Sequence, residues 1–244
     1  MRVLITGASS GIGLELAKQY LLQGSEVIAC GRDLLKLKAA FDGWQSAYPV
    51  FCTFDQSNLS QVNQQLGQHR NLDLVILNAG TCEYIDDALN FDSALFARVI
   101  QTNVVGTAHC LSAVLPNVNS GGRLALVSST VTLLPLTRAE AYGASKAALD
   151  YLAKSLAIDL AQHNIHVSLV APGFVDTPLT QTNDFTMPGL ISVELAAEKI
   201  LTGLAKGKQK IAFPARFYWS LKAMAFLPDA MWRKIAIKMV KADG

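Results

Sequence analysis

Short apolar runs alternate with longer stretches of helical periodicity, and this alternation limits the chain to very few folds. The runs are apolar at consecutive positions, as strands are when helices cover both faces of their sheet. We expect strands at Val3–Ile5, Val27–Ala29, Val50–Phe54, Leu74–Leu77, Leu124–Val127, Val167–Val170 and Lys210–Phe213. We expect helices at residues 11–23, 33–41, 60–68, 92–116, 140–163 and 193–206. This order requires right-handed crossovers and predicts an α/β fold: a doubly wound, mostly parallel, seven-stranded sheet in three α/β/α layers.

Residues 1–214 contain no internal repeat, linker or change in composition, so we expect them to form one domain. A chain of 244 residues is long enough to bury the core of such a domain. Within it, residues 176–191 include Pro178, Phe185 and Pro188 and are expected to form a lid over a substrate. Residues 215–244 have a basic, amphipathic pattern of their own and form a predicted helical C-terminal extension.

The composition excludes several classes of protein. Hydrophobic residues make up 51% of the chain and charged residues 16%, which indicates a globular protein and not a disordered one. The net charge of +2 is too small to favour a nucleic acid as partner. The dispersed cysteines and histidines have no ligand spacing, so we expect a reduced, cytoplasmic protein without a metal site. Because the first strand begins almost at once, we expect no secretory signal before it.

The C-terminal extension has an uneven charge. Residues 208–241 contain eight lysines or arginines and one acidic residue. Basic residues interrupt the apolar pattern there too often for a helix that spans a membrane. The apolar residues that recur at helical spacing are Phe217, Tyr218, Leu221, Met224, Ala225, Met231, Trp232, Ile235 and Met239. Two interpretations follow. Residues 215–241 lie on an anionic membrane surface, which would make the protein peripheral on the inner face of the membrane, or they dock on the subunit or a partner. Docking is favoured.

A glycine-rich loop, Thr6-Gly-Ala-Ser-Ser-Gly-Ile-Gly13, joins the first strand to the first helix. Gly7 permits a tight turn, Gly11 lets the backbone approach a pyrophosphate, and Gly13 allows the helix to pack closely on the strand. The helix N-terminus offers unpaired N–H groups and a positive dipole end to phosphates. The loop therefore predicts a dinucleotide site that is contacted by Gly7, Ser9, Ser10, Gly11, Ile12 and Gly13.

The residues after the second strand bear on the choice of cofactor. An acidic residue there would bind the ribose 2′-hydroxyl of NAD and repel the 2′-phosphate of NADP. In this chain Gly31 and Arg32 follow the strand, and a guanidinium can bind a phosphate through two hydrogen bonds. NADP(H) is favoured over NAD(H). The alternative is that Arg32 is a solvated loop residue without a ligand.

Tyr142 and Lys146 lie four residues apart and therefore share one face of a predicted helix. The pKa of a phenol must fall by about 3 units before the phenol can exchange protons near neutrality. An adjacent ammonium and an oxidised nicotinamide both stabilise the phenolate. Ser129, thirteen residues before Tyr142, follows a strand and can orient a substrate oxygen. Tyr218 and Lys222 repeat the four-residue spacing, but Ala205 stands thirteen residues before that tyrosine. Only the first pair has the accompanying serine.

The glycine loop, the Tyr142–Lys146 pair and Ser129 together resemble the short-chain dehydrogenase/reductase family over residues 1–178. The resemblance implies a Rossmann-type fold and further site residues. Asp55 resembles the residue that reads the adenine amino group, and Asn103 the asparagine that positions a water beside the lysine. The turn beside the adenine ribose and the loop at the nicotinamide carboxamide correspond to Asn78, Ala79 and Gly80 and to Pro172, Gly173, Val175 and Thr177. Leu77 and Gln56 depart from the family pattern on the adenine side.

The resemblance implies an NADP(H)-dependent oxidoreductase that transfers a hydride between nicotinamide and a carbonyl or alcohol carbon. Tyr142 would be the general acid or base, Ser129 would polarise the carbonyl, and Lys146 would lower the phenol pKa and hold the ribose. A small, apolar substrate and a homodimer or homotetramer are further expectations. The apolar wall would come from Cys82, Tyr84, Leu133, Leu134, Leu136 and Phe174. The alternative is a non-catalytic NADP-binding sensor or scaffold, with or without membrane contact.

The assignment of the cofactor leads to one test. If Arg32 binds the 2′-phosphate, the Arg32→Ala variant should raise the KM for NADPH far more than the KM for NADH. Steady-state kinetics with both cofactors measure the two changes. Equal changes in the two KM values would refute the assignment.

Overall fold

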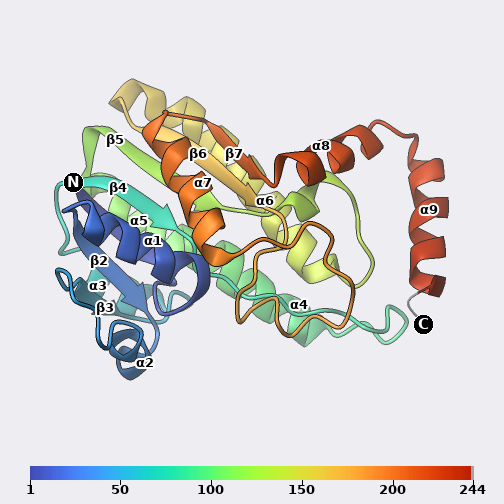
Figure 1. The fold of residues 1–244 in the computed structure, drawn as a ribbon, viewed down its shortest axis with the longest axis horizontal. Coiled ribbons are helices and arrows are strands. Elements are labelled where there is room, and N and C mark those ends of the chain that lie inside the picture. Colours follow the sequence, from blue (N-terminus) through green and yellow to red (C-terminus); the bar gives the residue numbers. More distant parts are fainter. Residues whose placement is uncertain (243–244) are drawn as a thin grey trace.

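The computed structural model describes residues 1–242, with side chains to residue 238. It contains one sheet in which every neighbouring pair of strands is parallel, in the order β3-β2-β1-β4-β5-β6-β7 (Figure 1). The predicted seven-stranded Rossmann-type sheet is confirmed. Its strands are β1 (Arg2–Thr6), β2 (Glu26–Gly31), β3 (Val50–Thr53), β4 (Leu72–Leu77), β5 (Val118–Val127), β6 (His166–Pro172) and β7 (Lys210–Phe213).

Helices cover both faces of the sheet, as the apolar strands require. One core joins α1 and α7 to side chains such as Val3 and Ile5, and the other joins α3, α5 and α6 to side chains such as Leu4. The alternation of neighbouring residues between two cores is what places a layer on each face. The α-helices up to residue 205 are α1 (Gly11–Leu22), α2 (Leu34–Ala39), α3 (Leu59–Leu66), α4 (Ser93–Ile100), α5 (Gly106–Val114), α6 (Glu140–Asp159) and α7 (Val193–Ala205).

Side-chain caps begin several of these helices. Asp33, Asn58, Asp92 and Ser192 each accept hydrogen bonds from backbone N–H groups in the first turn of α2, α3, α4 and α7 respectively. Asp, Asn and Ser are the residue types that most favour this position, because their short side chains reach the free N–H groups of the first turn. Such caps fix where each helix starts after the preceding strand or loop.

The helix predicted over residues 92–116 is wrong as a single α-helix. After α4 the backbone forms a π-helix, Gln101–Val105, before α5 continues to Val114. The apolar periodicity runs through this break, so the sequence pattern did not indicate it. π-Helical turns inside α-helices are frequent at functional sites, and this one contains Asn103.

The sheet order reverses at β1, because β2 and β3 extend to one side of this strand and β4 to β7 to the other. Ligands of open α/β sheets bind in the crevice at such a reversal, beyond the carboxyl ends of the strands. In this chain the glycine loop follows β1 and Asn78 follows β4, so both lie at that crevice.

The C-terminal extension folds as α8 (Ala215–Met224) and α9 (Asp229–Ala242), and α9 lies at the end of the molecule farthest from the N-terminus (Figure 1). Leu221 and Trp232 are buried against Leu134, and the Trp232 Nε1–H donates to the Pro135 carbonyl at 2.9 Å. Part of the predicted apolar stripe thus docks on the subunit itself. The side chain of Met239 lies outside the described part. No helix in the described part is long and apolar enough to cross a membrane.

Candidate active site

The glycine loop is packed so tightly that side chains are excluded from it. Gly7 and Gly11 have φ angles of +69° and +52°, in the left-handed region that favours glycine. A Cβ on Gly7 would lie 2.9 Å from Asn78 Nδ2, and a Cβ on Gly13 would lie 2.3 Å from the Gly7 carbonyl oxygen. The roles predicted for the tight turn at Gly7 and the close packing at Gly13 agree with this geometry.

Hydrogen bonds join the loop to the end of β4. The backbone N–H groups of Asn78 and Ala79 both donate to Thr6 Oγ1 at 3.0 Å. The Asn78 side chain donates to the Thr6 carbonyl at 3.1 Å and to the Gly7 carbonyl at 3.4 Å. These bonds hold the two halves of the sheet together at the crevice where a ligand would bind.

The N-terminus of α1 lacks the side-chain cap that α2, α3, α4 and α7 possess. Its N-cap residue, Ser10, makes no side-chain capping hydrogen bond. The first N–H groups of a helix need an acceptor, and a phosphate is a suitable one. A loop without room for side chains and an uncapped helix start therefore fit the pyrophosphate of a dinucleotide.

A cleft of about 930 Å³ extends from this loop along the carboxyl ends of the strands. Its walls include most of the residues predicted to bind the cofactor, namely Gly7, Ser9, Ser10, Gly11, Ile12, Arg32, Asp55, Asn78, Ala79, Gly80 and Thr177. Gly13 lies behind the loop and does not line the cleft. The walls also include Gln56 and residues that sequence reasoning missed, among them Lys36, Ser57 and Arg98. Lys36 had a readable signal, since it is a second cation four residues after Arg32.

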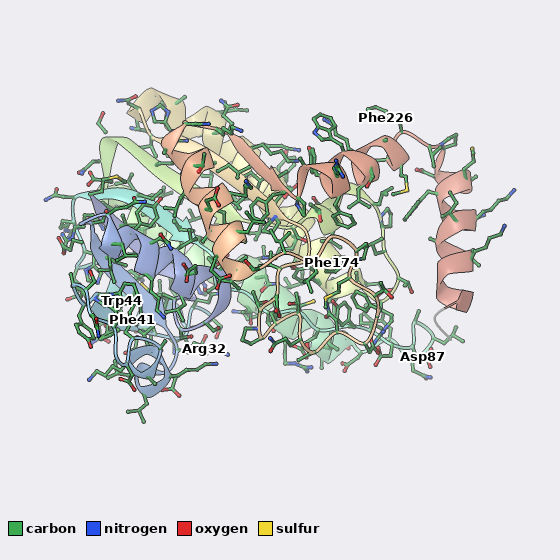
Figure 2. All side chains as sticks on the ribbon, viewed as in Figure 1. Arg32, Phe41, Trp44, Asp87, Phe174 and Phe226 are labelled. Atoms are coloured by element: carbon green, nitrogen blue, oxygen red, sulfur yellow. The ribbon has the colours of Figure 1, made fainter. Side chains whose placement is uncertain are left out.

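Charge at the far end of the cleft is mixed. Arg32 is exposed near the carboxyl end of β2 (Figure 2). The Asp55 carboxylate accepts hydrogen bonds from the Ser57 hydroxyl at 2.7 Å and the Ser57 N–H at 2.9 Å. These bonds, and the more distant Arg32 guanidinium, hold the pKa of Asp55 below its usual value. Asp55 is therefore ionised, and its Oδ1 faces Ser57 within the same turn.

The departure at Gln56 has a structural role. Its buried side chain donates to the Thr102 carbonyl at 2.7 Å, at the π-helical turn. A Cβ on Gly106 would lie 2.7 Å from Gln56 Cγ, so this glycine lets the helix approach. Gln56 therefore ties the end of β3 to the segment that contains Asn103.

The three groups predicted for proton transfer lie near the carboxyl end of β5. Ser129 follows this strand, and its hydroxyl accepts from the Val131 N–H at 3.2 Å. Lys146 is buried, and its Nζ donates to the Val127 carbonyl at 2.9 Å. The same Nζ lies 5.6 Å from the centroid of the Tyr142 ring. The nearby Ser129 hydroxyl lowers the pKa of the Tyr142 phenol, although burial has the larger, opposite effect.

Asn103 is fully buried, and its side-chain amide is fully engaged. The amide oxygen accepts from the Thr81 N–H and the amide nitrogen donates to the Thr81 carbonyl, both at 2.8 Å. The nitrogen also donates to Ser145 Oγ at 2.9 Å. A Cβ on Gly80 would lie 3.0 Å from Asn103 Oδ1 and 3.5 Å from Lys146 Nζ. Asn103 thus fixes the loop after β4 next to Lys146. The water that Asn103 was predicted to position stays a prediction.

Burial controls the protonation of the Tyr142–Lys146 pair. It lowers the pKa of Lys146 to about 8, against smaller upward effects of Cys82 and Asp150. It raises the pKa of Tyr142, and Cys82 adds to this effect while Ser129 opposes it. The Lys146 ammonium was expected to lower the pKa of Tyr142, but in the protein alone the pKa of Tyr142 is raised. The phenol is protonated near neutrality, which is the state that donates a proton.

The loop after β6 covers the glycine loop. Thr177 is buried, and its methyl group would lie 3.1 Å from a Cβ on Gly11. The Gly173 N–H donates to the Phe213 carbonyl at 2.7 Å, and Val175 forms a β-bridge with Ile191. Pro172, Gly173 and Val175 stand outside the walls of the cleft, so of the predicted nicotinamide loop only Thr177 lines it.

Comparisons with known proteins show the family of the chain. Residues 1–187 match the family described as short chain dehydrogenase. The chain belongs to the short-chain dehydrogenase/reductase family. An uncharacterized oxidoreductase of Myxococcus xanthus is 34% identical over 97% of this chain and 96% of its own length. A fatty acyl-CoA reductase of Acinetobacter baylyi is 33% identical over 86% of this chain and 74% of its own.

Solved structures of the family share the fold. A short-chain dehydrogenase of Burkholderia cenocepacia in complex with NADP superposes with a TM-score of 0.79 at 24% identity, over 93% of this chain and 98% of that one. One of Sphingobium yanoikuyae in complex with NADPH has a TM-score of 0.78 at 24% identity, over 94% and 97%. Family membership and the relatives identify this short-chain dehydrogenase/reductase as an NAD(P)-dependent oxidoreductase.

The buried Lys146 leads to a prediction about stability. Because burial lowers its pKa, the folded protein binds this proton more weakly than the unfolded chain. A Lys146→Met variant should therefore be more stable near pH 7 by roughly 1–2 kcal/mol, after the lost bond to Val127 is subtracted. The wild type should recover this difference as pH rises from about 8 towards about 10.4, where the unfolded lysine titrates.

Urea unfolding of the wild type and of Lys146→Met at pH 7, 9 and 10.5 measures this difference. A Lys154→Met variant, which replaces an exposed lysine of the same helix, is the matched control and should show no such dependence on pH. A stability difference between wild type and Lys146→Met that stays constant over this range would contradict the prediction.

Proposed function

We propose that the protein is an NADP(H)-dependent reductase or dehydrogenase that transfers a hydride between nicotinamide and a carbonyl or alcohol carbon. The observation that carries this proposal is the buried Lys146 beside Tyr142 near the carboxyl end of β5, the strand that Ser129 follows. The retained Tyr142, Lys146 and Ser129 favour turnover over a non-catalytic sensor or scaffold. We further propose that residues 1–214 form one domain with residues 215–244 as its extension.

The roles of the side chains follow from their chemistry. A bound nicotinamide supplies or accepts the hydride. Ser129 orients the substrate oxygen through its hydroxyl, and Tyr142 donates the proton to that oxygen in the reductive direction. Lys146 stabilises the phenolate that remains, because its ammonium lies next to the Tyr142 ring. Asn103 holds the Thr81 backbone and Ser145 beside these groups and supports a proton relay to water.

We propose that the cofactor is NADP(H). Arg32 and Lys36 both line the cleft at the carboxyl end of β2, and no acidic residue directly follows that strand. Two cations favour a 2′-phosphate, and the ionised Asp55 keeps its carboxylate directed to Ser57. The dinucleotide would be held by the glycine loop and the N-terminus of α1. The kinetic comparison of the Arg32→Ala variant tests this choice.

The substrate is proposed to be apolar. Aromatic rings from three segments pack together near the reaction centre, with centroids 5.6 Å apart for Tyr84–Phe185 and 5.8 Å apart for Phe174–Phe217. Figure 2 shows Phe174 beneath α8, next to the lid segment 176–191. The lid is attached by Asp184, which receives two hydrogen bonds from Arg138 at 2.8 and 3.1 Å. The relative named fatty acyl-CoA reductase supports an aliphatic carbonyl compound.

We also propose a homodimer or homotetramer. Tyr151 and Ile158 lie on one face of α6, seven residues apart, and are 78% and 77% exposed. Apolar side chains of this size, exposed on the face of a long helix, are typical of an interface between subunits. A second copy that packs on α6 would bury both side chains.

Replacing the proposed acid tests the reaction. The Tyr142→Phe variant should lose about 100-fold or more in kcat, because it cannot donate the proton, while NADPH binding stays nearly intact. Tyr218→Phe is the matched control, since Tyr218 and Lys222 have the same spacing away from Ser129. It should keep wild-type turnover. Substantial activity of Tyr142→Phe in NADPH oxidation assays would remove Tyr142 as the acid and favour another function.

The substrate class has a separate test. For a series of straight-chain aldehydes, ketones and acyl thioesters, kcat/KM should rise up to about fourfold for each added methylene, because each methylene buried in an apolar site adds a transfer free energy of about 0.8 kcal/mol. The measurement is NADPH oxidation followed at 340 nm, with short polar carbonyl compounds as controls. A kcat/KM that is independent of chain length would contradict an apolar substrate.

A further inference from the structure

The C-terminal extension exposes large apolar side chains that its own docking does not use. Trp219 on α8 is 60% exposed, and Phe226 in the link before α9 is 83% exposed. Met231 and Ile235 on α9 are 51% and 39% exposed. These four residues are called the C-terminal apolar surface below. Large apolar side chains that gather on a surface usually mark an interaction site.

The C-terminal apolar surface is separate from the docked side of the same helices. Leu221 and Trp232 are buried against Leu134, and the Trp232 indole donates to the Pro135 carbonyl. These contacts attach both helices to the subunit through one side. The exposed residues are therefore free to contact another body while α8 and α9 stay in place.

Basic residues accompany the exposed apolar residues. On α9, Lys234, Ile235 and Lys238 lie three, four and seven residues after Met231, so the four residues share one face, and all four are exposed. On α8, Lys222 Nζ lies 4.8 Å from the centroid of the Trp219 ring. Residues 208–241 as a whole contain eight lysines or arginines and one acid, whereas the net charge of the chain is only +2.

We propose that α8 and α9 dock the protein on the surface of an anionic lipid bilayer. Trp219, Phe226, Met231 and Ile235 would lie at the boundary of headgroups and acyl chains, and Lys234 and Lys238 would contact the anionic headgroups. Charge complementarity favours this occupant over a second copy of the chain. A symmetric dimer through the same surface would bring the lysines of one copy against those of the other.

The C-terminal extension lies next to the proposed substrate site. Phe217 of α8 lies on the inner side of the helix, with its ring 5.8 Å from Phe174 at the proposed substrate wall. The outer side of the same helix bears Trp219. A bilayer on the outer side would therefore lie next to the apolar wall of the site, one helix diameter away.

Vesicle sedimentation with the full-length protein tests the proposal. The probes are vesicles of phosphatidylcholine alone and vesicles with 40% phosphatidylglycerol, at low and high salt. We expect binding to the anionic vesicles and its loss at high salt, since salt screens the attraction. Lys234→Gln with Lys238→Gln should weaken partitioning about 30-fold, because each basic residue near an anionic surface contributes about fivefold. Phe226→Ser should weaken it about tenfold.

Matched control variants separate this surface from general charge and hydrophobicity. Lys199→Gln with Lys206→Gln removes the same charge from α7 and the residue that follows it, and Leu35→Ser removes a side chain that is 79% exposed on α2. Both should bind the anionic vesicles about as well as the wild type. Thermal unfolding of every variant checks that each protein is folded.

Three outcomes would overturn the proposal. One is no binding of the wild type to anionic vesicles, and another is equal weakening by the control variants and by the extension variants. The third is self-association in analytical ultracentrifugation that Phe226→Ser abolishes, without vesicle binding, which would assign the surface to a second copy. The sedimentation readout requires no turnover, so failure of the proposed reaction would leave it unaffected.

Discussion

The structure depends on the contact between the glycine loop and the end of β4. The hydroxyl oxygen of Thr6 and the carbonyl oxygens of Thr6 and Gly7 accept hydrogen bonds from Asn78 and Ala79. A Cβ on Gly7 would also meet the Asn78 side chain. This contact closes the crevice at the point where the sheet order reverses. The same contact directs the uncapped start of α1 into the cleft. One packing contact therefore lies both at the reversal of the strand order and at the proposed phosphate site.

The reaction centre places a cation where burial opposes it. Lys146 is buried with its Nζ on the Val127 carbonyl, and the pKa of its ammonium falls to about 8. Such a group destabilises the fold near neutrality, and groups with strongly shifted pKa values cluster at functional sites. The neighbouring phenol of Tyr142 is itself held protonated by burial. The pair is therefore set to donate a proton, and only added positive charge near the ring would favour the phenolate.

Much of the fold could be predicted from the sequence, because buried parallel strands have an unmistakable apolar pattern and Asp33, Asp92 and Ser192 mark helix starts by their capping chemistry. Contacts between distant segments could not. The π-helical turn contains Asn103, which bonds Thr81 and Ser145, and Thr102, which bonds Gln56; none of these contacts has a local signal in the sequence. The site residues were found through their spacing, whereas the pKa of Tyr142 depends on how the folded chain buries the ring.

The C-terminal extension illustrates why an amphipathic pattern alone does not decide between docking on the subunit and contact with a membrane. A single stripe was expected either to dock on the subunit or to meet a membrane, yet adjacent residues divide the two environments, since Trp232 is buried and Met231 is exposed. On a helix, neighbouring positions differ by about 100°, so a run of apolar residues can supply two faces. The inner face is satisfied by Leu134 and Pro135, and the basic residues lie with the outer one. The separation of charge therefore identifies which face is directed away from the protein.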